Sequence, residues 1–404
     1  MQKMVKMAKH QKRPVSSTHV VLFAKGDGIG PEIITAAIAV INAGIKKAYK
    51  SKRKIDWEEL LLGEEASKKF GTPLPQKELD RIEQYGLLFK GPLTTPVGSG
   101  IRSVNVQLRL TLDLYANIRP VKYLPGLESP LRRPENVDLI IFRENTDDLY
   151  MGIEWAYDSL GAAELRSVLA EQFGTNISDD SGIGIKPMGK AKTERIAKAA
   201  IEYALKNGRK SITIMHKGNI MKFTEGAFRE WCYAFFKANY RSKIVTEDEL
   251  NGKYKGKMPK GKILVNDRIA DNMFQQMIAK PQEYDMILAP NLNGDYISDA
   301  AGALIGNIGV LGSANLGNNG ALFEAVHGTA PKYAGKNVAN PTGVITAGCL
   351  MLDYLGWHEA AEIIRGAVEK SIKKKWVTRD IALNLKVKPL GTKQYAEKLV
   401  KIIG

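Results

Sequence analysis

Two aspartates, Asp295 and Asp299, lie four residues apart in the segment NLNGDYISDA, directly after a short apolar run. If this segment is helical, both carboxylates face the same side near its amino end, because residues i and i+4 share one face of a helix. Like charges so placed repel each other, and a hard cation such as Mg²⁺ or Mn²⁺ relieves the repulsion. A helix cap combined with an ion pair is the alternative interpretation, and the pair alone leaves both open.

A second group of residues combines hydroxyl, amide and guanidinium side chains: Ser103, Asn105, Arg109, Arg119 and Arg143. Guanidinium groups bind carboxylates through a fixed fork of donors. Arg119 and Arg143 lie in or directly after apolar stretches typical of strands, where an unpaired guanidinium would be costly. A bound polyanion would remove that cost, so the group indicates a site for a small molecule with several carboxylates.

The elements that must position these residues follow an α/β pattern. Apolar segments at 139–142, 212–214, 263–265 and 286–288 have the length of strands and end in charged or amide-rich stretches. Thr193 is expected to cap a helix that ends at Asn207-Gly208. Strands that alternate with helices predict an α/β fold, in which functional side chains lie at the carboxyl ends of strands.

The first expected strand, Val20 to Phe23, leads into the turn Gly26-Asp27-Gly28-Ile29-Gly30 and then Pro31, which suits the first turn of a helix. The dinucleotide fingerprint G-x-G-x-x-G requires a third glycine where Pro31 stands. The segment therefore predicts a strand, a tight turn and a helix, and it argues against the ordinary Rossmann fold.

Composition is that of an ordinary globular protein. The 404 residues are enough for two or three structural units, with 44% apolar and 25% charged residues. No uninterrupted apolar run is long enough to predict a membrane span. Cys232 and Cys349 lack the spacing of a zinc site or a disulfide framework. A reducing, cytoplasmic location is the expectation.

The net charge of +16 is high, and part of it lies in an N-terminal arm that has lysines and an arginine but no acidic residue. The arm predicts a disordered basic segment or, as the alternative, an organelle transit peptide. The basic runs lack interleaved aromatics or a nucleic-acid motif, which favours a solvated surface that attracts anionic ligands. Nucleic-acid binding through the arm and the basic tail is the alternative from another class.

Taken in order, the motifs resemble the metal-dependent isocitrate dehydrogenases of the decarboxylating β-hydroxyacid dehydrogenase superfamily. The resemblance runs through GDGIGPE, PLTTPVGSGIRSVNVQLR, IFRENTDDLYMGIEW, HKGNIMKFTEG, NLNGDYISDA and HGTAPKYAGKNVANP. It implies the isocitrate/isopropylmalate dehydrogenase-like α/β fold, with a large cofactor-side domain at 1–114 and 306–404, a small domain with the dimer interface at 115–147 and 190–305, and a clasp-like insertion at 148–189. The implied reaction is the tricarboxylic acid cycle step that converts isocitrate to 2-oxoglutarate and CO₂ while NADP is reduced.

The resemblance also implies roles by position. Isocitrate would be bound by Ser103, Asn105, Arg109, Arg119 and Arg143. Tyr150 and Lys217 would be the acid–base pair, and Asp271, Asp295 and Asp299 would hold Mg²⁺ or Mn²⁺. The family is a homodimer in which Lys217 and Asp271 reach into the partner's cleft. Lys217 or Asp271 would help remove the hydroxyl proton, and Tyr150 would protonate the enolate.

The coenzyme residues implied by the resemblance are Thr94, His327, Gly328, Lys332, Tyr333, Asn340 and Arg379. Lysine and tyrosine at positions 332 and 333 are typical of members that prefer NADP, in which they face the 2′-phosphate. Arg379 and Leu383 stand where many bacterial members have a tyrosine and an arginine, and Lys280 replaces an arginine that reaches over from the partner. NADP is therefore predicted, with use of NAD left open. Ser103 also occupies a position that is phosphorylated in some bacterial members.

Two relatives within the superfamily are alternatives. 3-Isopropylmalate dehydrogenase shares the arginines, Tyr150, Lys217 and the aspartates, but it uses an apolar residue to meet an isopropyl group. Ser103 and Asn105 instead offer hydrogen bonds, as an extra carboxylate requires. The second alternative is homoisocitrate dehydrogenase, whose substrate is longer than isocitrate by one methylene.

Overall fold

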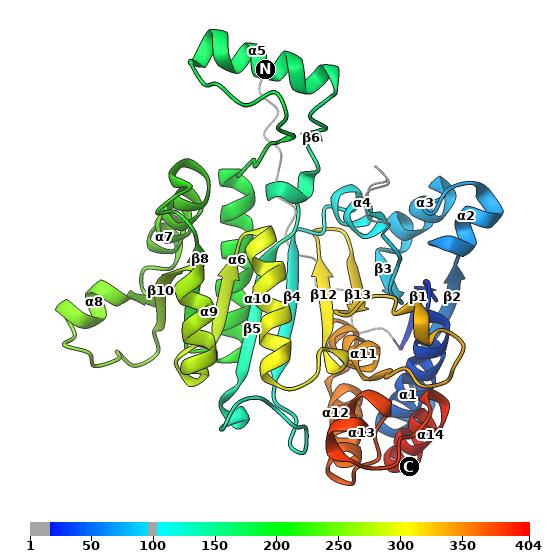
Figure 1. Cartoon of the computed structure of the whole chain (residues 1–404). Helices are drawn as coiled ribbons and strands as arrows, with labels where there is room; N and C mark the ends of the chain where they lie inside the picture. The colour runs from blue at the N-terminus through cyan, green and yellow to red at the C-terminus, as the bar shows by residue number, and fades with distance from the viewer. Residues whose placement is uncertain (1–16, 96–102) are drawn as a thin grey trace. The chain divides into compact units, whose positions relative to one another are not determined.

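The computed structural model describes residues 17–95 and 103–404 (Figure 1). The chain divides into two compact units. The first unit contains the chain up to Ile141 together with Phe274–Asp285 and Ile297–Gly404, and the second contains Phe142–Met273 and Met286–Tyr296. The chain passes from one unit to the other within β5 (Asp138–Glu144), α9 (Ala270–Ala279) and α10 (Asn291–Leu304). The division into a large domain, a small domain and a clasp stays a prediction.

The first unit has a mixed sheet with the strand order β2-β1-β3-β13-β12-β4. The bounds are β1 Thr18–Ala24, β2 Lys54–Leu60, β3 Leu87–Lys90, β4 Ala116–Lys122, β12 Gly312–Leu316 and β13 Ala321–Ala325. Strand β1 pairs in parallel with β2 and β3, and β13 pairs in parallel with β3. Strand β12 runs antiparallel to both β13 and β4, with Ala314 opposite Phe323 and Ile118.

Helices surround this sheet. They are α1 Gly30–Tyr49, α2 Glu64–Phe70, α3 Gln76–Tyr85, α4 Val104–Thr111, α11 Thr342–Tyr354, α12 His358–Lys373, α13 Arg379–Leu385 and α14 Thr392–Ile403. Helix α1 begins at the glycine turn and packs against α11, α12 and α14, which lie near one another in Figure 1. The predicted strand, turn and helix at the start of the fold are confirmed.

Helix α4, which carries Asn105 and Arg109, is held by its apolar face. Val104 and Leu108 of this helix belong to a buried cluster with Leu22 of β1, Leu88 of β3 and Leu322 of β13. Burial of one such side chain stabilises the fold by about 1.5–3 kcal/mol. The contact therefore fixes the polar residues of α4 relative to the sheet.

The second unit has a parallel sheet with the strand order β11-β8-β10-β9. The bounds are β8 Ser211–His216, β9 Ile244–Thr246, β10 Ile263–Ile269 and β11 Met286–Ala289, with helices α6 Lys190–Asn207, α7 Ala227–Tyr240 and α8 Glu247–Gly252. Within this unit, helix α5 (Leu160–Phe173) and the strand pair β6 (Glu154–Trp155) and β7 (Ile183–Gly184) stand away from the parallel strands (Figure 1).

The four apolar segments predicted as strands are β5, β8, β10 and β11, so these predictions are confirmed. The predicted start of the helix at Thr193 is wrong, because α6 begins at Lys190 and its N-cap is Gly189. The Thr193 hydroxyl donates to the Gly189 carbonyl (3.0 Å) and therefore does not cap a backbone N–H group. The predicted end is confirmed, since Gly208 terminates the helix in a left-handed conformation with φ 66°.

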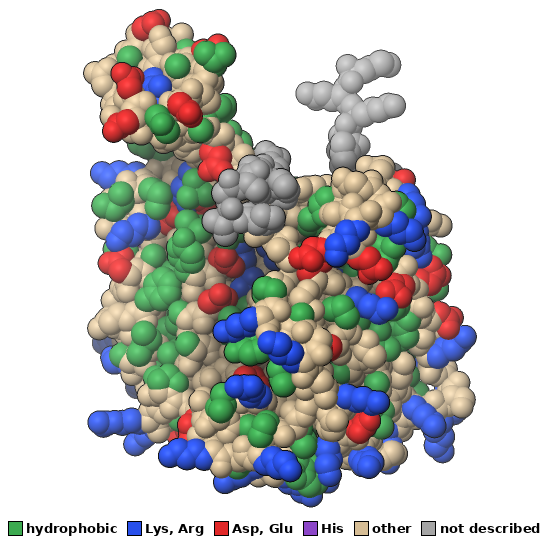
Figure 2. Space-filling model, turned by 45° about the vertical axis from the view of Figure 1, so that its right-hand side comes forward, with side chains coloured by type: hydrophobic (Ala, Val, Ile, Leu, Met, Phe, Trp, Pro, Cys, Tyr) green, Lys and Arg blue, Asp and Glu red, His purple; other side chains and the backbone are tan. Residues whose placement is uncertain are grey.

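Three predictions from composition concern membrane spans, the two cysteines and the distribution of basic side chains. Among the described residues, no helix is long and apolar enough to cross a membrane. Cys232 and Cys349 are buried free thiols. Figure 2 shows lysine and arginine side chains as separate spots on the visible face, with neutral and acidic side chains between them. The predicted basic arm falls largely on residues 1–16, which lie outside the described residues.

Gly28 occupies the glycine turn with φ 58°, and a β-carbon at this position would lie 2.2 Å from the Thr329 carbonyl oxygen. That oxygen also accepts the Ile29 N–H (3.0 Å). We expect Gly28→Ala to lower the free energy of unfolding by about 2 kcal/mol or more, because a left-handed alanine alone costs roughly 1–2 kcal/mol. Urea unfolding measures the change, with Gly252→Ala in open space as the control. Equal stability of the two variants would contradict the prediction.

Candidate active site

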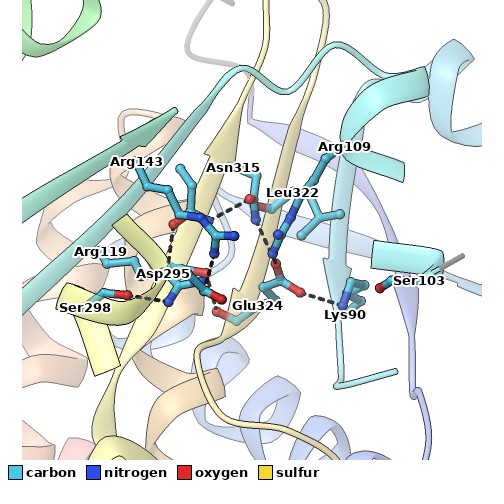
Figure 3. Close-up of polar contacts among 12 residues, drawn as sticks. Lys90, Ser103, Arg109, Arg119, Arg143, Asp295, Ser298, Asn315, Leu322 and Glu324 are labelled. Carbon is cyan, nitrogen blue, oxygen red and sulfur yellow. Dashed lines mark hydrogen bonds and ion pairs between the residues drawn. The ribbon is translucent and has the colours of Figure 1, made fainter. Parts of the chain in front are cut away.

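A buried ion cluster holds Arg109 in the first unit. The guanidinium Nη2 donates to Glu324 Oε1 (3.1 Å), and Lys90 Nζ lies 2.6 Å from Glu324 Oε2 (Figure 3). Burial by itself would raise the pKa of Glu324, but the two cations lower it well below its usual range. Nε of Arg109 is buried without a hydrogen-bond partner among the described residues. Arg109 is therefore anchored on one side and keeps donor capacity for a ligand.

Arg119, which is nearly fully buried in β4, is fixed by three side chains of the same unit. Its Nε donates to Asn117 Oδ1 (2.8 Å), and its Nη1 donates to Ser298 Oγ (2.6 Å) and lies 3.4 Å from Asp299 Oδ1. The Asp299 side chain is 58% exposed. The carboxylate thus pairs with Arg119 and can still be reached by an external cation.

Ser103 and Asn105 lie at the amino end of α4. Ser103 is the N-cap residue, but its side chain makes no capping hydrogen bond; its Oγ accepts from Thr95 Oγ1 (2.9 Å). Oδ1 of Asn105 is buried and has no hydrogen-bond partner among the described residues. Buried polar atoms are rarely left unsatisfied, so this acceptor suits a ligand that offers a hydrogen-bond donor, such as a hydroxyl group.

In the second unit, Arg143, Tyr150 and Asp295 converge. One oxygen of the Asp295 carboxylate pairs with Arg143, and the other accepts a hydrogen bond from the Tyr150 hydroxyl. The Arg143 guanidinium lies 4.7 Å from the centre of the Tyr150 ring, and its Nε donates to Asn291 Oδ1 (2.9 Å). Arg143 and Tyr150 come from one sequence motif and Asp295 from another, and the three side chains form one contact group.

Lys217 directly follows β8, and Asp271 is the second residue of α9. The two side chains form an ion pair, and the hydrogen bond from Lys217 lowers the pKa of Asp271. His216 supports the same turn: its Nδ1 accepts the Gly218 N–H (3.0 Å), so its Nε2–H donates to Asp267 (3.0 Å). Lys217 and Asp271 thus lie just after the carboxyl ends of β8 and β10, the kind of position where the α/β pattern predicts functional side chains.

Asp295 and Asp299 both lie in α10, so the predicted helix with i, i+4 spacing is confirmed. Among the described residues, no group of three or more His, Cys, Asp or Glu side chains is placed to hold a metal ion. Each of the two carboxylates has an arginine partner in this chain, and each is accessible enough for further contacts. Two carboxylates whose shell is completed by water, substrate or another carboxylate fit Mg²⁺ or Mn²⁺.

A cavity of about 330 Å³ in the first unit brings together most of the predicted coenzyme residues. His327, Gly328, Tyr333, Asn340 and Arg379 line it, together with Ile29, Asp380 and Leu383. The other two predicted residues are not among its lining residues. The Lys332 ammonium lies 4.8 Å from the centre of the Tyr333 ring, and the Thr94 N–H donates to Asp27 Oδ2 (2.7 Å).

His327 presents an unused acceptor at this cavity. Its Nδ1 lies 3.0 Å from the Gly328 carbonyl oxygen, which only accepts, so Nδ1 carries the proton. Burial lowers the pKa of His327 and favours the neutral ring. Nε2 is buried and has no partner among the described residues. A hydroxyl or amino group of a bound nucleotide would satisfy this nitrogen.

Several residues of the site were missed from the sequence, above all Lys90 and Glu324. Each lies in a short strand that is otherwise apolar, LLFK and ALFEA. A charged residue inside an apolar strand segment indicates a buried ion pair, because a buried charge needs a partner of opposite charge. Their pairing is invisible in the sequence, since the two residues lie far apart along the chain.

The chain belongs to the isocitrate/isopropylmalate dehydrogenase family, which it matches over residues 20–399. It is 52% identical over 386 residues to "Isocitrate dehydrogenase [NADP]" of Caldococcus noboribetus, covering 95% of this chain and 90% of that protein. It is 50% identical to the protein of the same name from Archaeoglobus fulgidus, covering 96% and 93%. Its fold resembles the crystal structure of isocitrate dehydrogenase from Methylococcus capsulatus with TM-score 0.78 and 39% identity, covering 95% and 99%. The predicted family and fold are confirmed.

We expect Glu324→Gln to lower the free energy of unfolding at pH 7 by about 3–5 kcal/mol, because Lys90 and Arg109 would lose their buried counter-charge. The folded-state pKa of Glu324 is depressed, so its contribution is present above the unfolded value of about 4.3 and is lost as pH falls below it. The variant should therefore lose less further stability in acid. Urea unfolding at several pH values measures both effects, with Glu194→Gln on the surface as control. Wild-type stability and an unchanged acid slope would refute the role given to Glu324.

Proposed function

We propose that this chain is an NADP-dependent isocitrate dehydrogenase that converts isocitrate to 2-oxoglutarate and CO₂. The observation that carries the proposal is the set of three buried arginines, Arg109, Arg119 and Arg143, each anchored by a carboxylate of the chain. Anchored guanidinium groups suit a substrate with three carboxylates. The high identity to proteins named isocitrate dehydrogenase [NADP] supports the same substrate.

Residues of α4 and the arginines bind and orient the substrate. Arg119 and Arg143 bind substrate carboxylates, and Ser103 and Asn105 donate to the carboxylate that distinguishes isocitrate from 3-isopropylmalate. The Ser103 hydroxyl is not used as a helix cap, which supports this role. A fixed substrate orientation lowers the entropic part of the barrier.

Lys217 and Tyr150 carry out the proton transfers. When bound to Asp295 and Asp299, a divalent cation would polarise the C2 oxygen of the substrate. Lys217, paired with Asp271, helps remove the hydroxyl proton, and the Tyr150 hydroxyl delivers a proton to carbon after CO₂ leaves. The hydrogen bond from Tyr150 to Asp295 supports a position of the phenol beside the reacting centre.

The active form is a homodimer in which Lys217 and Asp271 serve the partner's cleft. The 71% exposed side chain of Asp271 and the lack of a complete metal-ligand group among the described residues support a contribution from a second chain. The two buried free thiols support a reducing, cytoplasmic location.

NADP binds with its adenosine part in the cavity lined by His327 and Asn340, and it supplies the hydride acceptor. The unused Nε2 of His327 accepts from the nucleotide. Lys332 and Tyr333 face the 2′-phosphate, to which the lysine contributes a positive charge and the tyrosine a hydroxyl. Arg379 at the cavity wall is a further cation available to this phosphate.

The purified protein should turn over isocitrate with Mn²⁺ and NADP and should lose this activity when the metal is chelated. The assay follows coenzyme reduction, with NAD, homoisocitrate and 3-isopropylmalate in parallel reactions. Absence of isocitrate turnover by folded dimer would refute the proposal. Faster turnover of homoisocitrate or 3-isopropylmalate would replace it with one of those activities.

Lys332→Asp combined with Tyr333→Ile should shift coenzyme preference from NADP towards NAD. The change removes the positive charge and the hydroxyl and adds a negative charge that repels the 2′-phosphate. We expect kcat/KM for NADP to fall about a hundredfold or more, equivalent to roughly 2.7 kcal/mol. The matched control is Lys336→Met in the same loop. An unchanged ratio of NADP to NAD efficiency would contradict the role of the pair.

A further inference from the structure

Lys186, which lies between β7 and α6, is a buried lysine that joins two buried carboxylates of the second unit. Its ammonium pairs with Asp148 and lies 2.9 Å from Glu225 Oε1. The side chain of Lys186 is 14% exposed, and those of Asp148 and Glu225 are at most 1% exposed. Asp148 and Glu225 lie within the motifs IFRENTDDLYMGIEW and HKGNIMKFTEG, but no role was predicted for them or for Lys186.

Asp148 holds the turn that carries Tyr150. It is the first residue of the 3₁₀ turn Asp148–Met151 and has φ 70°, a left-handed conformation that is strained for a residue with a β-carbon. Its Oδ2 accepts the N–H of Leu292 (3.0 Å) in the first turn of α10. The carboxylate thus ties the Tyr150 turn to the helix that presents Asp295.

Glu225 does the same for the turn that carries Lys217. Its Oε2 accepts the backbone N–H of Lys217, and Asn293 Nδ2 of α10 donates to the same oxygen (2.8 Å). Glu225 lies in the π-helical segment Lys222–Gly226, a rare geometry that is frequent at functional sites. The turns of Tyr150 and Lys217 are therefore tied to the same end of α10 by two different carboxylates.

The Lys186 ammonium is the link between these carboxylates. Burial by itself would lower the pKa of Lys186, but its bonds to Asp148 and Glu225 outweigh burial and raise it. Without the ammonium, two buried carboxylates would face each other without a counter-charge. Either carboxylate would then have to take up a proton or move towards water, and both changes weaken the bonds that hold its turn.

We propose that Lys186 is a positioning residue for proton transfer, which acts by clamping Asp148 and Glu225 and so holds the Tyr150 and Lys217 turns against α10. This rests on the acid–base roles given to Tyr150 and Lys217 under the proposed function. Because Tyr150 serves its own cleft and Lys217 the partner's, one buried lysine in each subunit supports both active sites of the dimer.

The test compares Lys186→Met with the charge-preserving Lys186→Arg and with Lys198→Met, an exposed lysine of α6 that pairs with Glu202 in the same unit. In Lys186→Met we expect kcat for isocitrate to fall about 10- to 100-fold through misplaced acid–base groups. The Kd for NADP, measured by fluorescence titration, should stay within about twofold, because the coenzyme cavity lies in the first unit. Lys186→Arg should recover most of kcat, and Lys198→Met should match the wild type.

A folded Lys186→Met with wild-type kcat would overturn the proposal, and so would equal losses in kcat and NADP affinity, which indicate general destabilisation. If Lys186→Met does not fold, Lys186→Met with Glu225→Gln removes one of the two opposed carboxylates, and full kcat in this double variant would equally overturn it. A wild type that does not turn over isocitrate would refute the proposed function instead.

Mixed dimers test the claim that both sites depend on each lysine. A hybrid of one wild-type and one Tyr150→Phe subunit should retain about half of the wild-type activity, because one cleft keeps a complete acid–base pair. A hybrid of wild type with Lys186→Met should fall well below half, since one cleft loses its Tyr150 geometry and the other its Lys217 geometry. Half activity in the second hybrid would overturn the link to Lys217.

Discussion

A charged side chain that is removed from water must be matched by an opposite charge, and this constraint shapes the interior of both units. Arg109 and Lys90 meet at Glu324, Arg119 pairs with Asp299, and Arg143 pairs with Asp295. Such pairs add little net stability, because desolvation offsets most of the attraction. Their effect is geometric: each guanidinium is held in one orientation before any ligand arrives.

The apolar core supplies the rigidity that these charges need. Helix α4 is held by Val104 and Leu108 in a cluster with strands of the first unit, so Arg109 approaches Glu324 from a fixed helix. In the second unit, α10 receives backbone and amide contacts from Asp148 and Glu225 at its first turn. The polar side chains keep fixed positions because the helices and strands that carry them are closely packed. A shift of these elements would leave cavities in the core.

Much of the candidate site could be predicted from the sequence. The spacing of Asp295 and Asp299 predicted a shared helix, and the charged ends of apolar runs predicted where Arg143 and Lys217 would lie. Thr193 shows why a helix start cannot be predicted from residue type alone. A threonine can cap a helix or donate to a carbonyl inside its first turn, and the backbone conformation determines which of the two it does. Lys90, Glu324 and Lys186 were missed because each pairs with residues distant in the sequence.

By itself the sequence determined the family, the α/β order of elements and the residue types of the site, because long ordered motifs and hydrophobic periods are local properties. Only the tertiary structure decided which charges meet. Glu324 joins cations from β3 and α4, and Lys186 joins the turns of Tyr150 and Lys217, through contacts that span many residues of chain. Electrostatic pairing acts through space, so the partners appear only when packing has brought separate segments together.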